Sequence, residues 1–531
     1  MKTKIIAVLM LFAFTVLGAQ TVHNPNDELY KDIDRWFVQG YITDFIPMVR
    51  PYPAQLINKL LDQVINNGDA SARETAAAYK AKIAPGTRFI TPGILGHIQG
   101  NDEDYELIGA PFAEGLFQVN SVFNVSYNLT FFGLTDHEGG ERFNVPGTYN
   151  IYPDLIDDTA DIGPFRILQN WTSIATLGTS DMYFQAGLSR SSFGPFYDNG
   201  VVVGPQAPRA GHFSFVYSRP LWSMEMLFQT LSATDDWGNG RFSQKYNIIH
   251  ALNFRPWNNL ELGIVQSLVY GKRIDPLYFV PFTFMFGLQT VNGFEDNALI
   301  GLYFRGRLFN SLLVKGQIYI DDFSFNGLKD GNPFFKTAGI AGVSWAPRNS
   351  VLSKLDFDYT AVMPYMYTHW IEREYNVQPG EPNYLNYTHM GRNIGPELEP
   401  NSDRISLRTR WGIIRNLDIN VSAYMIRHGN ASADHSPNNH LDQDGSIFDH
   451  GTNYYGSGYN TNPHRTFNFL TQSVIETRLG GTLGIAYTLP SPLGTFRFIS
   501  EYGIQQTRNR GFVRGENYID HFWSVGGVWS W

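Results

Sequence analysis

The last stretch of the chain constrains its fold more than any other feature. In the final nine residues, alternate positions fall on two faces: Trp523, Val525, Gly527, Trp529 and Trp531 on one, Ser524, Gly526, Val528 and Ser530 on the other. A last strand with a period-two apolar face and an aromatic final residue is typical of bacterial outer-membrane β-barrels. A soluble β-sandwich can also end in a strand, so the rest of the chain has to decide between the two.

The first residues predict export. Lys2 and Lys4 precede an apolar run over residues 5–17, and small residues lead up to Gln20. This pattern predicts a signal peptide at residues 1–19, whose apolar run is too short for a spanning helix. Because Gln20 stands where a lipoprotein would have Cys, we expect no lipid anchor.

Composition narrows the class. Aromatic residues make up 15% of the chain, Gly contributes 51 residues, and charged residues are only 17%. No apolar run of about 18 residues follows the signal, so helical spanning is not expected, whereas alternating strands hide their apolarity from a window average. The absence of Cys excludes a disulfide framework and thiolate chemistry. The net charge of -9 argues against a nucleic-acid partner.

Residues 20–87 predict a small helical bundle. The three expected helices are 27–39, which stops at Gly40, a second with an apolar stripe over 56–65, and an Ala-rich third with a Ser71/Glu74 capping box. Three short amphipathic helices cannot bury their stripes alone. We therefore expect them to pack together and against the periplasmic end of a barrel.

Residues 88–531 show a period of two and predict the barrel itself. The longest alternation runs over residues 117–131, with apolar side chains at odd positions and polar ones at most even positions. Similar alternation recurs at 354–361, 404–411, 417–425 and 496–504. No helix is expected after residue 86.

Connections between these segments alternate in length. Short turns are expected at 256–259, 347–350, 415–416 and 491–494, and long polar stretches at about 271–297, 322–337, 363–402, 428–468 and 505–517. Short periplasmic turns and long extracellular loops are the outer-membrane pattern. Counting in this way gives about sixteen strands from residue 116 and two more from 88–115. The prediction is an all-β transmembrane barrel of roughly 16–18 antiparallel strands, which we expect to be a monomer surrounded by outer-membrane lipid.

The long loop at 363–402 carries the residues best suited to a sugar ligand. Aromatic rings can cover the apolar faces of sugars, while planar polar groups pair with hydroxyls and carboxylates. The candidate polysaccharide-binding residues are Trp370, Tyr384, Tyr387, His389, Arg392 and Glu397. Solvated loops without a ligand have a similar composition, so this alternative stays open.

Three arginines are expected to face the lumen. Arg404, Arg408 and Arg410 alternate with apolar residues, and the preceding strand offers Asp356 and Asp358 as partners. These arginines would either favour an acidic solute or pair with the lumen acids.

Neither metal, cofactor nor catalysis is expected. The histidines at 428, 435, 440, 450 and 464 are spaced irregularly, without the tight pairs of a structural metal site. No nucleophile elbow, zinc-protease motif or phosphate-binding loop is present. A set of Ser, His and acid brought together only by folding would make an outer-membrane hydrolase, which remains an alternative.

Several stretches, in a consistent order along most of the chain, resemble the Wzi-type capsule assembly proteins of Gram-negative outer membranes. They are Arg50-Pro51-Tyr52-Pro53, Ser191-Ser192-Phe193-Gly194-Pro195, Gly204-Pro205-Gln206-Ala207-Pro208, Asp275-Pro276-Leu277-Tyr278, Glu295-Asp296-Asn297, Tyr319-Ile320-Asp321-Asp322-Phe323, Tyr387-Thr388-His389-Met390-Gly391, Ile394-Gly395-Pro396 and Ser402-Asp403. The chain departs from the family at Phe193, where a Trp is common, and its loop at 428–468 looks particular to itself.

The resemblance implies a barrel of about eighteen strands with N-terminal helices at the periplasmic end. It also implies an outer-membrane surface lectin that holds capsular polysaccharide, with an occluded lumen and no export through it. A porin or solute channel is the main alternative and would need an open lumen.

Overall fold

The computed structural model describes residues 23–44, 46–83, 90–135, 160–196, 199–233, 244–292, 296–323, 335–369, 384–430, 447 and 469–531. The expected signal peptide, Trp370 and the histidines at 435, 440, 450 and 464 lie outside these ranges.

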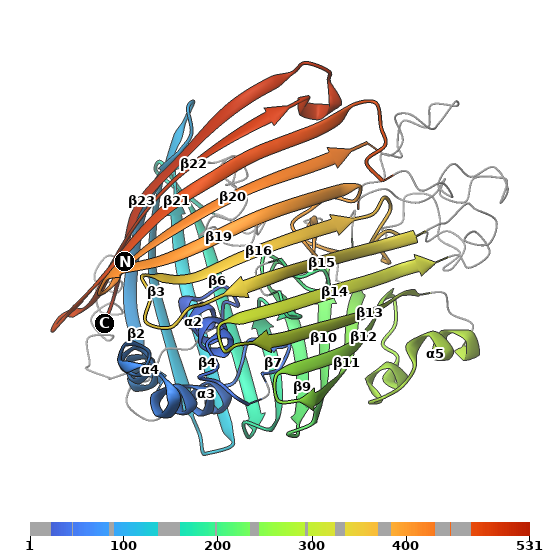
Figure 1. Ribbon diagram of the computed structural model, residues 1–531, viewed down its shortest axis with the longest axis horizontal. Helices are drawn as coiled ribbons and strands as arrows, with labels where there is room; N and C mark the ends of the chain where they lie inside the picture. The colour runs from blue at the N-terminus through green and yellow to red at the C-terminus, as the bar shows by residue number, and fades with distance from the viewer. Residues whose placement is uncertain are drawn as a thin grey trace.

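The chain forms a closed barrel of 18 antiparallel strands (Figure 1). In order around the barrel they are β2 (Thr91–Gly100), β3 (Tyr105–Gln118), β4 (Phe123–Leu134), β6 (Phe165–Gly178), β7 (Met182–Ser189), β9 (Ala210–Ser218), β10 (Trp222–Leu231), β11 (Lys245–Trp257), β12 (Leu260–Gly271), β13 (Asn297–Leu308), β14 (Leu312–Phe323), β15 (Phe335–Trp345), β16 (Leu352–Val362), β19 (Ser402–Ile414), β20 (Leu417–Gly429), β21 (Ile475–Ser491), β22 (Gly494–Arg508) and β23 (Asn517–Ser530). The short β5 (Ala160–Ile162) pairs with the first residues of β6. The last strand closes the barrel on the first, with Val525 opposite Ile98. Closure confirms the predicted barrel and excludes the sandwich.

The longest alternating segment is not a single strand. Residues 117–131 are two strands, β3 and β4, joined by a turn at 119–122. The Asn120 side chain stabilises the turn by accepting hydrogen bonds from the backbone N–H groups of Val122 (2.9 Å) and Phe123 (2.8 Å). Phe117 pairs with Val125, so odd residues face outward on both strands and the alternation continues through the turn.

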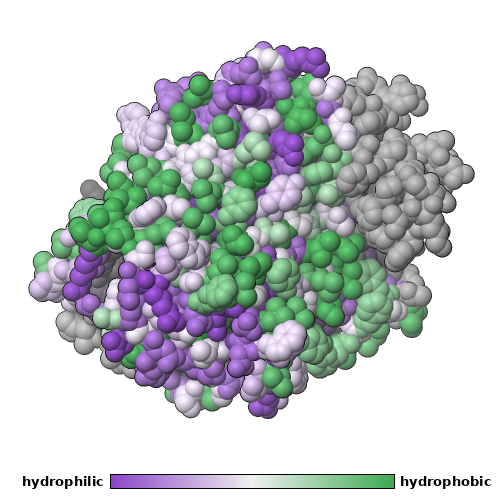
Figure 2. Space-filling model, in the orientation of Figure 1, coloured by the Kyte–Doolittle hydropathy of each residue, from purple (hydrophilic) through white to green (hydrophobic). Residues whose placement is uncertain are grey.

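The outer wall of the barrel is apolar. Large side chains are exposed on strands all around it, for example Ile94, Trp171, Leu302, Phe357 and Leu483. Figure 2 shows patches of hydrophobic side chains on one face of the molecule. A closed barrel with such a wall suits a hydrocarbon surrounding, because its strands satisfy their backbone hydrogen bonds among themselves. Within the described part of the chain, no helix combines the length and apolarity needed to cross a bilayer.

The three N-terminal helices are α2 (Glu28–Val38), α3 (Ala54–Asn67) and α4 (Ala70–Ile83). They contact the end of the barrel that carries the short connections, here called the short-turn end. There, Lys59 pairs with Asp181 at 2.8 Å and Arg415 pairs with Glu74. The cap of α4 differs from the prediction, because the Asp69 carboxylate accepts a hydrogen bond from the N–H of Ala72.

Helix α2 packs inside the barrel rather than beneath it. Its Ile33 and Trp36 are fully buried. On its acidic side, Asp32 pairs with Arg410 of β19 at 3.1 Å, and Glu28 pairs with Arg497 of β22 at 3.4 Å. Ion pairs to two strands of the wall therefore fix the helix in the lumen.

Two loops from the opposite, long-loop end also fold into the lumen. Residues 190–196 and 199–209 belong to the first loop, whose β8 (Ser192–Phe193) pairs with β1 (Val49–Arg50) from the N-terminal segment. Residues 384–401 contain the hairpin of β17 (Thr388–His389) and β18 (Arg392–Asn393). The two loops meet where the N–H of Gly204 donates to the carbonyl of Ile394 at 2.9 Å.

The loop between β12 and β13 corrects another expectation. Residues 271–297 were expected to be polar and without helix. They contain the short 3₁₀ helix η2 (Pro276–Phe279) and the helix α5 (Met285–Asn292). Figure 1 shows α5 outside the barrel wall.

Candidate functional site

A cavity of about 720 Å³ lies in the lumen between α2 and the β17–β18 hairpin. Its wall is formed by inward-facing residues of consecutive strands, including Arg305, Lys315, Ser344, Lys354, Arg404, Asn420, Thr482 and Glu501. Pockets that hold small organic ligands have volumes of about 300–1,000 Å³. The cavity is therefore large enough for part of a saccharide chain.

The surface of the cavity is rich in cations. Twelve Lys and Arg residues line it, against five Asp and Glu residues. At least eight of these cations pair with a carboxylate, as Lys354 does with Asp356 at 3.0 Å and Arg408 with Asp358. Asp358 does not line the cavity, so the guanidinium of Arg408 lies at the surface with its acid behind it. Cations held in this way can donate charge-assisted hydrogen bonds to an acidic or hydroxyl-rich ligand.

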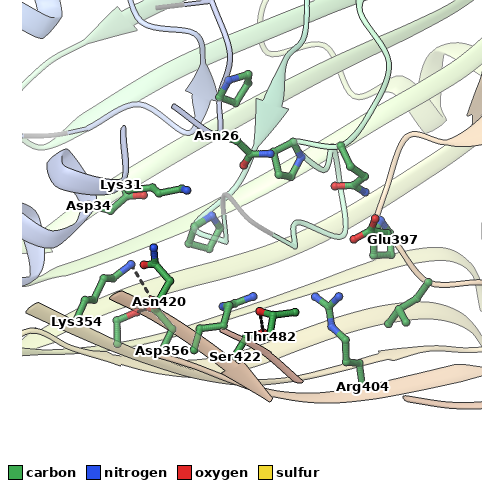
Figure 3. A pocket seen from close by; sticks show the side chains of 18 of the residues that line it. Asn26, Lys31, Asp34, Lys354, Asp356, Glu397, Arg404, Asn420, Ser422 and Thr482 are labelled. Atoms are coloured by element: carbon green, nitrogen blue, oxygen red, sulfur yellow. Dashed lines mark hydrogen bonds and ion pairs between the residues drawn. The ribbon is translucent and has the colours of Figure 1, made fainter. Parts of the chain in front are cut away.

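The wall of the cavity also carries polar, uncharged side chains, which lie beside Arg408 and Arg410 in the sheet. Asn420, Ser422 and Thr482 project from β20 and β21, as Figure 3 shows. The hydroxyl oxygens of Ser422 and Thr482 are 2.6 Å apart. Hydroxyl and amide groups both donate and accept hydrogen bonds, which matches the chemistry of sugar hydroxyls.

At the end nearer the long loops, Glu397 lies among cavity-lining residues that include two arginines, Arg392 and Arg404. Glu397 exposes its side chain to the cavity, and Arg404 reaches in from β19 (Figure 3). Burial within the protein raises the pKa of the Glu397 carboxyl above its ordinary value, while the charges of Arg404 and Arg392 oppose that rise. Glu397 is thus an acid that takes up a proton more readily than a carboxyl in water.

The structure separates the residues predicted to bind polysaccharide. Arg392 and Glu397 line the cavity. Tyr387 is fully buried, with its ring stacked on Tyr367 at 5.3 Å between centroids. His389 is also buried: Nδ1 accepts from the N–H of Ser232 at 2.9 Å, and Nε2 lies 3.0 Å from the carbonyl oxygen of Arg209. Tyr387 and His389 therefore hold the loop in shape.

Tyr384 lies at the root of the same loop, where its ring is 5.5 Å from the Lys272 ammonium. Arg404, Arg408 and Arg410 all line the cavity. The sequence reasoning missed the contribution of α2 and of the inward cations Arg305 and Lys315. The alternation of β13 and β14 was the signal that could have found these two.

Within the described ranges, no group of three or more His, Cys, Asp or Glu residues is arranged to hold a metal ion.

The sequence matches no protein-family model and no curated protein. Among solved structures, the fold is similar to that of Wzi, described as an outer-membrane protein involved in group 1 capsule assembly in Escherichia coli and a carbohydrate-binding β-barrel. The two share 12% identity over 96% of this chain and 99% of that one, with a TM-score of 0.58. OpdK of Pseudomonas aeruginosa with vanillate shares 9% identity over 83% of this chain and 98% of that one, with a TM-score of 0.45. This chain therefore has the fold of Wzi, an 18-stranded barrel.

Proposed function

We propose that the protein is an outer-membrane lectin that anchors capsular or other surface polysaccharide and assists capsule assembly. In this proposal the short-turn end and the N-terminal helices face the periplasm, and the long loops face outward. The fold supports it, because Wzi is described as a carbohydrate-binding barrel involved in capsule assembly.

The observation that carries the proposal is the arrangement of the lumen. Folded segments occupy it from both ends and leave a cavity lined with cations, hydroxyls and amides. Its groups are held in place by ion pairs and hydrogen bonds, such as those of Lys354 and Ser422. Prearranged polar groups of this kind suit non-covalent binding, since little side-chain freedom is lost when the ligand arrives.

Binding by many barrels at the cell surface adds to the affinity of a single cavity. A polysaccharide presents the same unit many times, and many barrels in one membrane can hold one chain. Weak individual contacts then sum to stable retention through multivalency. No catalytic step is needed for this role.

The first test is a deletion strain in which cell-associated and released polysaccharide are measured separately. We expect polysaccharide to be shed into the medium at unchanged total yield, and the full-length protein to restore retention. Unchanged attachment in the deletion strain would contradict the anchoring role.

A pair of variants then tests the site. Arg392→Ala removes a cation at the loop end of the cavity. Arg219→Ala removes an exposed cation at the short-turn end, where the guanidinium contacts Tyr217. Both barrels should reach the membrane folded, but only Arg392→Ala should increase shedding. Equal retention by the two variants would remove Arg392 from the binding surface.

A further inference from the structure

In the loop that joins β12 to β13, residues 272–292 fold back along the outside of the barrel. Phe279 packs on Phe228 of β10 with ring centroids 4.9 Å apart, and Phe282 lies 6.4 Å from Trp222, the first residue of that strand. The loop therefore descends from the long-loop end toward the short-turn end. We call residues 272–292 the outer flap.

A second apolar core lies between the outer flap and the wall. Tyr278 and Met285 of the flap are fully buried there. The wall contributes outward-facing residues of three strands: Met226, Ile248, Leu268 and Tyr270. Elsewhere on the barrel, outward-facing residues such as Leu262 and Ile264 are exposed. The flap thus shields these outward-facing side chains of β10, β11 and β12 from the surroundings of the barrel.

The flap also covers polar side chains on the outer face of the wall. The Gln266 side chain donates to the carbonyl of Thr283 and accepts from the N–H of Met285 at 3.0 Å. Its neighbour in register, His250, is only 4% exposed and lies against the backbone of Tyr278. Polar side chains at such positions would be costly in hydrocarbon without this cover.

The position of Gln266 along β12 places these contacts below the rim at the long-loop end of the barrel. Gln266 lies five residues before Gly271, the end of β12. At about 3.4 Å per residue this is about 17 Å along a tilted strand, compared with an apolar band of about 25 Å on outer-membrane barrels. The flap therefore covers part of the wall that would otherwise lie within that band.

The side of the flap that faces away from the barrel is apolar. Leu277, Val280, Phe282, Phe284 and Val291 are exposed there, Val291 by 83%. Residues 276–294 contain no charged side chain. The charged residues gather at the roots instead, where Arg273 pairs with Asp296 and Tyr278 donates to Asp296 at 2.7 Å. A loop surrounded by water rarely exposes so many apolar side chains without a charged residue among them.

We propose that the outer flap is embedded in the membrane and that its exposed face contacts the acyl chains of the outer leaflet. Continuity supports lipid as the occupant, because the flap's apolar face extends the apolar belt of the wall around it. This proposal rests on the proposed membrane location.

Embedding would connect the membrane to the candidate site. Both roots of the flap contact the loop at 384–401: Lys272 lies over the ring of Tyr384, and the Asn297 side chain donates to the carbonyl of Leu385 at 2.9 Å. A flap held by lipid thereby fixes the base of the loop that carries Arg392 and Glu397.

Site-directed spin labelling tests the proposal directly, since the chain has no Cys and a single-cysteine variant carries one label. The flap variants are Phe284→Cys and Val291→Cys. Ile264→Cys, exposed by 46% on the wall, is the lipid reference, and Glu516→Cys in the β22–β23 connection is the water reference. Each is folded into phospholipid vesicles, and label collisions with oxygen and with a water-soluble nickel chelate are compared.

We expect labels at 284 and 291 to collide several-fold more with oxygen than with the chelate, as at 264, with the opposite ratio at 516. Chelate-accessible labels at 284 and 291, with 264 protected, would overturn the flap proposal and leave the membrane barrel intact. Chelate access at 264 as well would contradict the membrane location itself. Strong spin–spin coupling between labels at 291 would show a second copy in place of lipid and would also overturn the proposal.

Discussion

At the residue scale, burial decides which ion pairs between the barrel and the N-terminal helices contribute to stability. Arg410 and Arg415 belong to β19 and the turn after it, and each pairs with an acid of the N-terminal helices. The Arg410 side chain is 16% exposed and its partner Asp32 is 3% exposed. The Arg415 and Glu74 side chains are 75% and 61% exposed, so water screens their attraction. The two arginines make a matched pair for measuring how the lumen holds α2.

Arg410→Ala should destabilise the docked helix, because it leaves Asp32 buried without this partner. Asp32 keeps Arg35 (3.1 Å) and the Tyr79 hydroxyl (3.0 Å) as partners, so the loss should stay below the roughly 3–5 kcal/mol of an uncompensated buried charge. It should still exceed the about 0–1 kcal/mol that an exposed pair contributes. Urea unfolding of the barrel in vesicles, with protease cleavage of residues 23–83 as a local probe, gives the comparison. Equal losses for Arg410→Ala and Arg415→Ala would mean that the ion pairs do not fix α2.

The acid at the loop end of the cavity predicts a pH dependence. Burial raises the pKa of Glu397 above the ordinary value for a glutamate of 4.5, so as pH falls this carboxyl gains its proton earlier than a free carboxyl. Protonation removes a negative charge that competes for Arg392 and Arg404. Affinity for an acidic oligosaccharide should therefore rise as pH falls from neutral toward the raised pKa, while the uronic acid groups of the probe remain ionised.

Calorimetric titration of the purified barrel with oligogalacturonate at two pH values measures this effect, with a neutral maltooligosaccharide as the control ligand. Glu397→Gln should bind the acidic probe at neutral pH as the native barrel does at low pH. If the variant keeps the full pH dependence, another group is responsible for it.

At the scale of elements, alternation identified strands well but could not mark where they end. The turn at 119–122 has the parity of the strands it joins, so the pattern of apolar residues runs through it. Only the side chain of Asn120, a turn-forming residue, distinguished it. The same alternation placed Arg404, Arg408 and Arg410 in the lumen, since a period of two fixes which face a residue takes.

The loops show where sequence reasoning fails and why. Aromatic and imidazole groups have the chemistry to bind a sugar, yet residue type cannot separate a ring at the rim from one in a packed core. Tyr387 and His389 are buried because two loops distant in sequence close over them. The outer flap was missed for a similar reason: α5 is stabilised by the barrel wall against which it packs.

At the scale of the whole molecule, the number of strands and the contents of the lumen give opposite expectations for transport. Porins of 16–18 strands leave an aqueous channel, and a barrel of 18 strands has the same circumference. Here the N-terminal segment joins β8 in a small sheet inside the barrel, and Glu225 on the wall accepts hydrogen bonds from the N–H groups of Met48 (2.8 Å) and Val49 (2.9 Å). These contacts attach the N-terminal segment to the inner face of the barrel wall.

Conductance in planar bilayers separates an anchoring barrel from a solute channel. We expect the native protein to conduct far less than an open barrel of this size, because the lumen is occupied by folded segments.

Glu225→Ala removes the acceptor for two backbone N–H groups at a cost of about 1–3 kcal/mol for each group left unpaired, so it should produce brief openings. Glu225→Gln keeps an acceptor oxygen and should stay closed. A steady, open-porin conductance from the native protein would contradict the occupied lumen and favour the channel. If the native protein and both variants show no conductance while the cavity still binds acidic saccharide, retention of polysaccharide at the cell surface would be left as the role of the barrel.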